Sequence, residues 1–578
     1  MSLNSQYMLD PPQPDNPTPE DRHLLLKTAL KQKGWPGDFE AILVRMAPPV
    51  PVTSLAQPGF FQGVRVGVAG GGLAGLSAAY ELRKMGFDIT VFDALTDRVG
   101  GRVYTYAFDN QPDLIGEFGP MRIPVSHETV WHYLREFRLS TYPFIQSNPN
   151  SFIYLKNTRV RNDVDGRNVQ SFIYPKYALN PRERSMSWQK LLYAGTDAHL
   201  LRASQRARLE ILETKAHYAP ETLDWINKTS LTLMEEGGLS QAAINLVSNF
   251  APLLDGNLYS SFIDYIQESY PADLSYLYAI DGGTARLPSA FYQSFFTEKP
   301  YASLHQSPIG RVTYRPGCLI RAIAADGGGR RVTLCYDNLS DHTNHRETFD
   351  YLVCALPFST LRNVTVTPLF SGQKMRAIRE VNYTPSQKTL LCCRERFWEK
   401  QGIFGGGSYT DLPVASLWYP SDSARRLRAP NETADFAESL SPAPGVLIGS
   451  YNFNLDTTRL FNQFDGIFSA EVLQNVADVH GLTTEAVTES VLALKTVNWN
   501  QEPTFRGALC FYTPAQKRLF AADMALPEYD NRVFFAGEHV AAVHRWMQGA
   551  LQTGMQAAND LVLSALSHHR VSDRYLYE

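Results

Sequence analysis

The sequence predicts an α/β protein whose central unit is a Rossmann-like, dinucleotide-binding fold, and three observations support this. Residues 66–69 form a short apolar run that is typical of one buried parallel strand. Gly70, Gly72 and Gly75 then follow the spacing G-x-G-x-x-G, and a helical pattern begins at once. A second apolar strand, I-T-V-F, ends at the acidic residue Asp93.

Each position in this unit has a physical role. Gly70 permits a tight turn, Gly72 lets the backbone approach a pyrophosphate, and Gly75 lets the helix lie close on the strand. The amides at the start of the helix face the phosphate anion, and the acid after the second strand can accept hydrogen bonds from an adenosine ribose. The dinucleotide-binding residues expected here are Gly70, Gly72, Leu73, Ala74, Gly75, Asp93 and Ala94.

Length and composition exclude several classes of protein. A chain of 578 residues can bury a large core and hold two or three domains. The hydrophobic content of 44% and charged content of 19% are ordinary for a soluble enzyme. A net charge of −4 provides no basic field, so no nucleic-acid partner is expected. No apolar stretch approaches the roughly 18 residues of a membrane span, so no membrane association is expected either.

The N-terminus and the cysteines bear on location. The opening M-S-L-N-S-Q-Y-M-L-D lacks the basic and apolar regions of a signal peptide. The six cysteines show no metal-ligand spacing and are interpreted as reduced, mostly buried side chains. We therefore expect a cytoplasmic protein without a metal site, although a mature secreted form would have the same composition.

The other elements follow from local patterns. A helix is expected from Asp21 to Lys33, and another should begin at Ser126, a favourable N-cap residue. Strands with polar turns are expected over 151–170, a helical region over 185–251, and strands again over 302–361. The side chains of the first helix expected to point inward are Leu24, Leu25, Leu26 and Leu30.

The segment after Asp93 indicates which dinucleotide is bound. It reads A-L-T-D-R-V-G-G-R-V, so a basic residue and two glycines precede Arg102. This resembles the flavin amine oxidases, which bind FAD, whereas nicotinamide-dependent dehydrogenases do not carry such a segment. The resemblance spans most of the chain from about residue 64 to residue 565. It implies that Gly101, Arg102 and Leu319 contact FAD.

The resemblance also implies a domain organisation, because this family assembles its FAD-binding domain from separated pieces of chain. The expected domains are an N-terminal extension at 1–58, a discontinuous FAD-binding domain at 59–125, 300–365 and 530–565, a substrate-binding domain of mixed α and β structure at 126–185, 252–299 and 366–529, a helical domain at 186–251, and a C-terminal tail at 566–578.

The stretch from Gly116 reads G-E-F-G-P-M-R-I-P, which resembles the L-amino acid oxidases, while the related tryptophan monooxygenases have A-M-R there. The resemblance implies that Arg122 holds the α-carboxylate of the substrate. A planar guanidinium can bind a carboxylate through two parallel charge-assisted hydrogen bonds. Amine and polyamine oxidases need no such residue, and a structural ion pair is the alternative role for this arginine. The FAD contacts implied here are Gly119, Pro120, Met121 and Arg122.

Three further candidates lie in the later strands. Lys388, in Y-T-P-S-Q-K-T-L-L-C-C, resembles the family lysine that reaches flavin N5 through a water, where it would assist oxygen reduction or imine hydrolysis. The alternative is a lysine on an edge strand facing solvent. The segment V-L-I-G-S-Y resembles the family position at which a phenol, here that of Tyr451, bonds the substrate carboxylate. Trp418 follows G-G-G-S-Y-T-D-L-P and belongs either to the pocket wall or to the core.

The segment R-V-F-F-A-G-E-H resembles the closing FAD signature of the family. The resemblance implies that Glu538 bonds the ribityl or pyrophosphate region and that a helix beginning within 545–549 directs its N-terminus at the flavin ring. Arg545 departs from the family, which usually has a small residue there, and is a candidate for the substrate pocket. His544 is interpreted as structural rather than as a general base. The FAD contacts implied here are Gly537, Glu538, Trp546, Met547 and Gln548.

Together these resemblances imply an FAD-dependent L-amino acid oxidase that uses O2 and releases a 2-oxo acid, ammonia and hydrogen peroxide. Hydride would pass from the substrate Cα to flavin N5, and the protein would form a homodimer or homotetramer. A decarboxylating 2-monooxygenase that forms an amide and an amine or polyamine oxidase remain alternatives. The implied catalytic residues are Lys388, Arg122, Tyr451 and Trp546.

The substrate side chain stays open at this point. In L-amino acid oxidases a residue that faces the substrate side chain comes from the stretch just before D-G-G-T-A-R-L-P. An acid there suits arginine or lysine, and a ring suits phenylalanine or tryptophan, and both kinds are present. The candidates are Asp264, Tyr265, Glu268, Tyr270 and Asp273.

Overall fold

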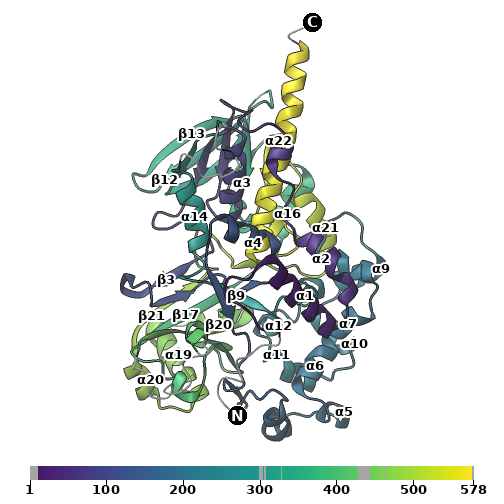
Figure 1. Cartoon of the computed structure of the whole chain (residues 1–578), viewed down its shortest axis with the longest axis vertical. Coiled ribbons are helices and arrows are strands. Elements are labelled where there is room, and N and C mark those ends of the chain that lie inside the picture. Colours follow the sequence, from purple (N-terminus) through teal and green to yellow (C-terminus); the bar gives the residue numbers. More distant parts are fainter. Residues whose placement is uncertain are drawn as a thin grey trace.

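The computed structural model describes residues 11–297, 304, 308–326, 328–426, 443–461 and 464–575. In Figure 1 the region around α3 (Leu73–Lys84) lies at one end, a large sheet lies toward the other end, and a group of helices lies beside that sheet. The C-terminal helix α22 (Met547–Tyr575) runs along the first region and extends beyond it (Figure 1). The α/β fold class is confirmed.

A parallel five-stranded sheet forms the nucleotide-binding part, in the order β10–β2–β1–β14–β23. Its strands come from three distant parts of the chain. Because all of them run parallel, their carboxyl ends lie at one edge of the sheet. Helices α3 and α22 pack closely, since a Cβ on Gly554 would lie 2.3 Å from the carbonyl oxygen of Ala74. The exact domain limits remain a prediction. The strands are β10 (Val312–Arg315), β2 (Asp88–Phe92), β1 (Arg65–Ala69), β14 (Tyr351–Cys354) and β23 (Val533–Phe535).

A four-stranded sheet packs against this unit and shares a buried core with it, which includes Phe92, Leu334 and Leu352. Its order is β13–β12–β11–β15, and only the pair β11–β15 is parallel. The expected strands over 302–361 therefore divide between two sheets. The strands are β13 (Thr343–Phe349), β12 (Val332–Asn338), β11 (Cys318–Ala325) and β15 (Thr365–Thr367).

The largest sheet has seven strands in the order β21–β17–β20–β19–β18–β7–β8. Strand β17 is buried along its whole length and pairs antiparallel with β20 and β21. Strands β7 and β8 confirm the strands expected over 151–170. The strands are β21 (Val491–Asn498), β17 (Ser386–Cys393), β20 (Gly445–Phe453), β19 (Ser416–Tyr419), β18 (Gly406–Thr410), β7 (Phe152–Leu155) and β8 (Thr158–Arg161).

Short strands and helices complete the fold. The small sheets contain β3 (Thr105–Ala107) with β4 (Ile115–Glu117), β16 (Tyr383–Thr384) with β22 (Leu509–Cys510), and β5 (Ile123–Pro124) and β6 (Thr141–Phe144) on either side of β9 (Leu277–Ile280). The helices of the region expected over 185–251 are α6 (Trp188–Gly195), α7 (Asp197–Arg202), α8 (Gln205–Glu210), α9 (Pro220–Asn227), α10 (Ser230–Glu236) and α11 (Gln241–Ser248). The others are α1 (Pro19–Lys33), α2 (Phe39–Met46), α4 (Glu128–Glu136), α5 (Pro181–Arg184), α12 (Pro252–Gly256), α13 (Phe262–Ile266), α14 (Arg286–Ser294), α15 (Phe358–Leu361), α16 (Gly372–Glu380), α17 (Asp422–Arg426), α18 (Leu455–Phe461), α19 (Asp465–His480), α20 (Thr484–Ser490) and α21 (Gln516–Met524).

Two local expectations were wrong. In α1, Leu24 is 57% exposed, because only one face of the helix meets the core. Helix α4 begins at Glu128 rather than at Ser126. The Ser126 hydroxyl donates to Asp273 Oδ1 at 2.5 Å, so a distant carboxylate takes the group that would otherwise cap the helix.

All six cysteines are free thiols, and five of them are buried. The adjacent Cys392 and Cys393 lie in β17 and belong to different apolar clusters, as expected for neighbours on opposite faces of a strand. Within the part of the chain that the structure describes, no helix combines the length and the apolar character needed to cross a membrane.

Candidate active site

A cavity of about 460 Å³ runs along the carboxyl edge of the parallel sheet. Gly70, Asp93, Ala355 and Gly537, which follow four of the strands, all line it. The carboxyl edge is where open parallel sheets bind their ligands. The sequence-predicted residues that line this cavity are Gly70, Gly72, Leu73, Ala74, Asp93, Ala94, Gly101, Arg102, Gly119, Pro120, Leu319, Tyr451, Gly537, Glu538, Arg545, Trp546 and Met547.

The glycine turn has the shape that a bound pyrophosphate requires. Gly72 is the N-cap of α3, and as a glycine it has no side chain that could cap the helix. A Cβ on Gly72 would meet nothing within 4 Å, so its backbone faces open cavity. Gly75 does not line the cavity, but a Cβ there would lie 1.9 Å from the carbonyl oxygen of Gly70. The turn therefore leaves amide donors and space for an anion, which fits a dinucleotide.

Asp93 is buried and lines the cavity. Its Oδ2 accepts a hydrogen bond of 2.7 Å from Tyr314, and its Oδ1 accepts one of 3.1 Å from the Leu95 amide. Burial raises the pKa of the Asp93 carboxyl. A Cβ on Gly71 would lie 2.3 Å from Asp93 Oδ2, so this glycine gives the carboxylate room. Sequence reasoning missed Tyr314, because nothing in its strand indicates a partner more than two hundred residues earlier.

Glu538 joins three segments that line the cavity. Its Oε1 accepts a 2.9 Å hydrogen bond from Arg102 and one of 3.2 Å from the Cys510 amide, and its Oε2 accepts one of 3.1 Å from the Arg545 amide. Burial opposes ionisation, but Arg102 and the nearby histidines hold the pKa of the Glu538 carboxyl below its usual range. The Glu538 carboxylate is thus negatively charged, and it links the segments that contain Arg102, Cys510 and Arg545.

The side chain of Gln548 is directed away from the cavity. Its Oε1 accepts from the Thr129 amide at 3.0 Å, and its Nε2 donates to the Met46 carbonyl at 2.8 Å. These bonds attach the start of α22 to α4 and to the end of α2. Helix α22 itself begins at Met547, inside the expected range.

Lys388 and Tyr451 lie opposite each other in β17 and β20. The Lys388 Nζ donates to the carbonyl oxygens of Gly119 at 2.7 Å and Glu117 at 3.1 Å. Burial lowers the pKa of Lys388 to about 7. Burial also raises the pKa of Tyr451 to about 12. Lys388 is thus a buried amine that titrates near neutral pH, and it does not face solvent.

Arg122 lies near both of these side chains, since its positive charge lowers the pKa of Lys388 and that of Tyr451. Its Nη1 donates to Gln146 Oε1 at 2.8 Å. The guanidinium lies 5.1 Å from the centre of the Trp418 ring. Trp418 is buried and contributes to the core, where its ring supports Arg122. The residues that line the cavity do not include Trp418, Arg122, Lys388 or Met121.

Trp546 lines the cavity, and its ring stands edge-on to His127 at 4.9 Å. Its indole nitrogen is buried and has no hydrogen-bond partner among the described residues. His127 in turn contacts Asp273 at 3.2 Å.

Residues lining the cavity that sequence reasoning missed include Leu356, Pro357, Trp499, Phe505 and His539. Trp499 and Phe505 stand in a loop, where only their aromatic character offered a signal.

The structure separates the five candidates for contact with the substrate side chain. Asp264 pairs with His544 at 3.3 Å, Tyr270 donates to Asp38 at 2.8 Å, and Asp273 accepts from Ser126. Burial raises the pKa of the Tyr265 phenol, and among the nearby charges that of Glu268 raises it further while that of Arg545 lowers it. Glu268 is paired with Arg545 at 3.2 Å.

The sequence matches the family described as flavin containing amine oxidoreductase over residues 73–562. It is 29% identical over 520 residues to an L-amino-acid oxidase of Pseudechis australis, covering 88% of each chain. It is also 29% identical over 504 residues to an L-amino-acid oxidase of Sistrurus catenatus edwardsii, covering 86% of each chain.

Two solved structures share the fold. Putrescine oxidase bound to putrescine has a TM-score of 0.64 at 16% identity, covering 86% of this chain and 99% of that one. Cyclohexylamine oxidase from Brevibacterium oxydans has a TM-score of 0.63 at 15% identity, covering 88% and 99%. With the glycine turn, the cavity and the family match over most of its length, the chain belongs to the flavin-containing amine oxidoreductases and is an oxidoreductase that uses FAD.

Proposed function

We propose that the protein is an L-amino acid oxidase, and the arrangement of Arg122 beside Tyr451 and Lys388 carries this proposal. An amine substrate has no carboxylate, so Arg122 would have no group of this kind to bind in it. The names of the relatives from Pseudechis australis and Sistrurus catenatus edwardsii support the same substrate class.

Arg122 is suited to hold the substrate α-carboxylate. Its single hydrogen bond to a described residue uses Nη1, so Nε and Nη2 remain as donors along one edge of the guanidinium. That edge can bind a carboxylate with two parallel hydrogen bonds. The Trp418 ring beneath the guanidinium and Gln146 hold its plane. The Tyr451 phenol, protonated at neutral pH, can donate a third bond.

Lys388 is suited to act on water or on the product imine. FAD, when bound, would supply the oxidising chemistry at the substrate Cα–N bond. The two carbonyl oxygens of Glu117 and Gly119 fix the position of the lysine nitrogen. With its pKa near 7, the amine can release or take up a proton at physiological pH. The balanced reaction is amino acid, O2 and water to 2-oxo acid, ammonia and hydrogen peroxide.

The test is to incubate the FAD-loaded protein with each of the twenty L-amino acids and with putrescine, and to measure oxygen, peroxide and ammonia. Equal amounts of 2-oxo acid, ammonia and peroxide support the oxidase. An amide one carbon shorter than the substrate, with carbon dioxide and little peroxide, would identify a decarboxylating monooxygenase. Turnover of putrescine and of no amino acid would overturn the proposal. Size-exclusion chromatography with light scattering would test the expected homodimer or homotetramer.

A further inference from the structure

Arg545 has an unusual backbone for its residue type. Its φ of +72° lies in the left-handed region, which glycine adopts readily and other residues rarely do. The residue stands immediately before Trp546, and both line the cavity. Such a conformation persists only where neighbours hold it, and it is found mainly at functional sites. Here the Arg545 amide donates to Glu538 Oε2 at 3.1 Å.

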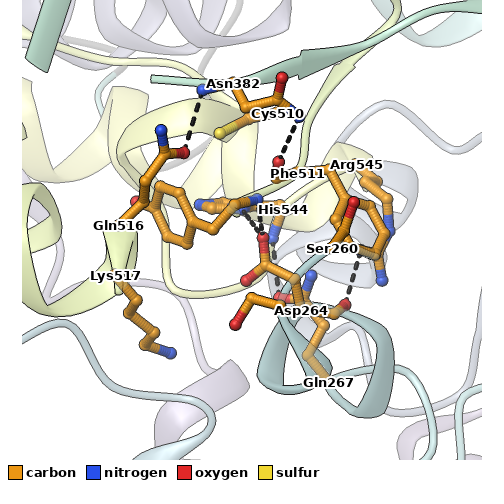
Figure 2. A network of polar contacts seen from close by, with 12 residues as sticks. Ser260, Asp264, Gln267, Asn382, Cys510, Phe511, Gln516, Lys517, His544 and Arg545 are labelled. Atoms are coloured by element: carbon orange, nitrogen blue, oxygen red, sulfur yellow. Dashed lines mark hydrogen bonds and ion pairs between the residues drawn. The ribbon is translucent and has the colours of Figure 1, made fainter. Parts of the chain in front are cut away.

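The side chain of Arg545 is held equally firmly. Only 4% of it is exposed, and its Nη1 donates to the Asp264 carbonyl at 2.6 Å. The guanidinium lies 4.9 Å from the centre of the Phe511 ring. Figure 2 shows Arg545 beside the segment that carries Asp264 and Gln267, with Asp264 directed at His544. The loop before α22 is thus attached to α13 by both backbone and side chains.

The charge of Arg545 is matched by one carboxylate. Glu268 Oε1 lies 3.3 Å from Arg545 Nε and 3.2 Å from Nη2, and the Glu268 side chain is 13% exposed. Among the described residues, Arg545 is the only basic side chain within ion-pair distance of Glu268. A mostly buried carboxylate is therefore neutralised by an arginine that lines the cavity.

This ion pair lies near the residue to which the substrate carboxylate is assigned. Burial raises the pKa of Tyr451 to about 12, and the charges of Arg122, Glu268 and Arg545 all act on the same phenol. The charges of Glu268 and Arg545 sum to zero, and Lys388, whose nitrogen lies 4.4 Å from the centre of the Tyr451 ring, is a further titratable group there.

We propose that Arg545 masks Glu268, so that the enzyme accepts uncharged substrate side chains and rejects cationic ones. This inference rests on the proposed L-amino acid oxidase function. A lysine or arginine side chain would bring a second positive charge toward a buried guanidinium, where like charges repel strongly. An uncharged side chain meets a neutral pair and has no such penalty. Removing the Arg545 side chain would leave the Glu268 carboxylate available to a cationic substrate.

The test compares kcat/KM for L-lysine and L-arginine with that for L-leucine in four proteins. They are the wild type, Arg545→Gly, Arg545→Asn, and Arg545→Gly combined with Glu268→Gln. Glycine and asparagine both tolerate the left-handed backbone, so either variant preserves the loop. Flavin absorbance confirms that each protein has bound FAD. We expect the ratio of lysine to leucine to rise about 10- to 100-fold in both single variants, chiefly through KM.

The double variant is the matched control. The gain should disappear when Glu268→Gln removes the carboxylate, because the cationic side chain then has no partner. A wild type that oxidises lysine as well as leucine would overturn the inference, as would a ratio unchanged in both single variants or a gain that survives Glu268→Gln. If the FAD-loaded wild type oxidises no L-amino acid, the proposed function itself fails, and this inference fails with it.

Discussion

The ammonium group of Lys388 lies 4.4 Å from the centre of the Tyr451 ring, because the two residues are directly opposed across the antiparallel pair β17–β20. Opposed residues in such a pair project from the same face of the sheet. The ladder therefore places a titratable amine beside a phenol that lines the cavity, and it does so without any loop that must be ordered first.

Replacing Lys388 with methionine should slow the reaction while FAD remains bound. The buried amine of Lys388 lies beside Tyr451 and has a pKa of about 7. Loss of such an acid or base typically slows a step by about 100-fold or more. Stopped-flow traces would separate reduction by substrate from reoxidation by oxygen. In the wild type, the rate of the step that the variant slows should show an inflection near pH 7, and the variant should lack this inflection. Unchanged rates in both half-reactions would disprove the assignment.

The same lysine should affect stability in a defined direction. Its pKa in the folded protein, about 7, lies below its ordinary value of 10.5. Between these values the unfolded chain binds a proton that the folded chain does not, so this residue makes stability rise with pH over that window. Thermal unfolding followed from pH 6 to pH 10 should show a weaker rise in Lys388→Met. An identical pH dependence in the two proteins would contradict the lowered pKa.

Replacing Arg122 with alanine should reduce kcat/KM for amino acids about 30- to 1000-fold, which corresponds to a loss of roughly 2–4 kcal/mol. The cause is the loss of two charge-assisted bonds to the carboxylate. Arg122→Lys retains the charge but not the planar pair of donors, so it should recover only part of the activity. The decarboxylated amine corresponding to the best substrate is the control. Equal losses on the amino acid and the amine would rule out a carboxylate-binding role.

Two glycines of the turn should respond differently to alanine. In Gly72→Ala the new Cβ meets no protein atom and φ is −76°, so the apoprotein should unfold at the same temperature while FAD binds more weakly. In Gly75→Ala the Cβ would lie 1.9 Å from the Gly70 oxygen, so both the melting temperature and FAD affinity should fall. Scanning calorimetry of the apoproteins and FAD titration would check this. A Gly75→Ala apoprotein as stable as wild type would contradict the close packing.

Asp264→Asn should destabilise the protein by about 3 kcal/mol, because it removes the buried carboxylate that pairs with His544 at 3.3 Å. Burial opposes ionisation of Asp264, but His544 and Arg545 hold the pKa of its carboxyl below the ordinary value. Its contribution is therefore complete above about pH 4 and is lost on acidification. Asp224→Asn is the control, since this 50% exposed partner of Lys228 should matter little. Equal melting temperatures for the two variants would refute the prediction.

Local sequence was sufficient to predict the nucleotide-binding turn. Strand β1, the turn and helix α3 are contiguous, so the spacing of Gly70, Gly72 and Gly75 reports directly on contacts made within a few residues. Similarly, the apolar run L-L-C-C just after Lys388 indicated a buried strand, and β17 is buried along its whole length. The resemblance to a family then identified FAD and drew attention to Arg122 and Tyr451.

Only the tertiary structure decided which charged groups meet. Arg545 and Glu268 are separated by more than 270 residues, and Tyr314 reaches Asp93 from a strand more than 200 residues later. The Gln548 side chain was expected at the cofactor and instead bonds α4. Periodicity predicts which face of an element is buried, but it carries no information about which distant segment covers that face. The identity of a buried polar partner depends on how whole elements pack, and for this chain that packing paired Glu268 with an arginine that lines the cavity.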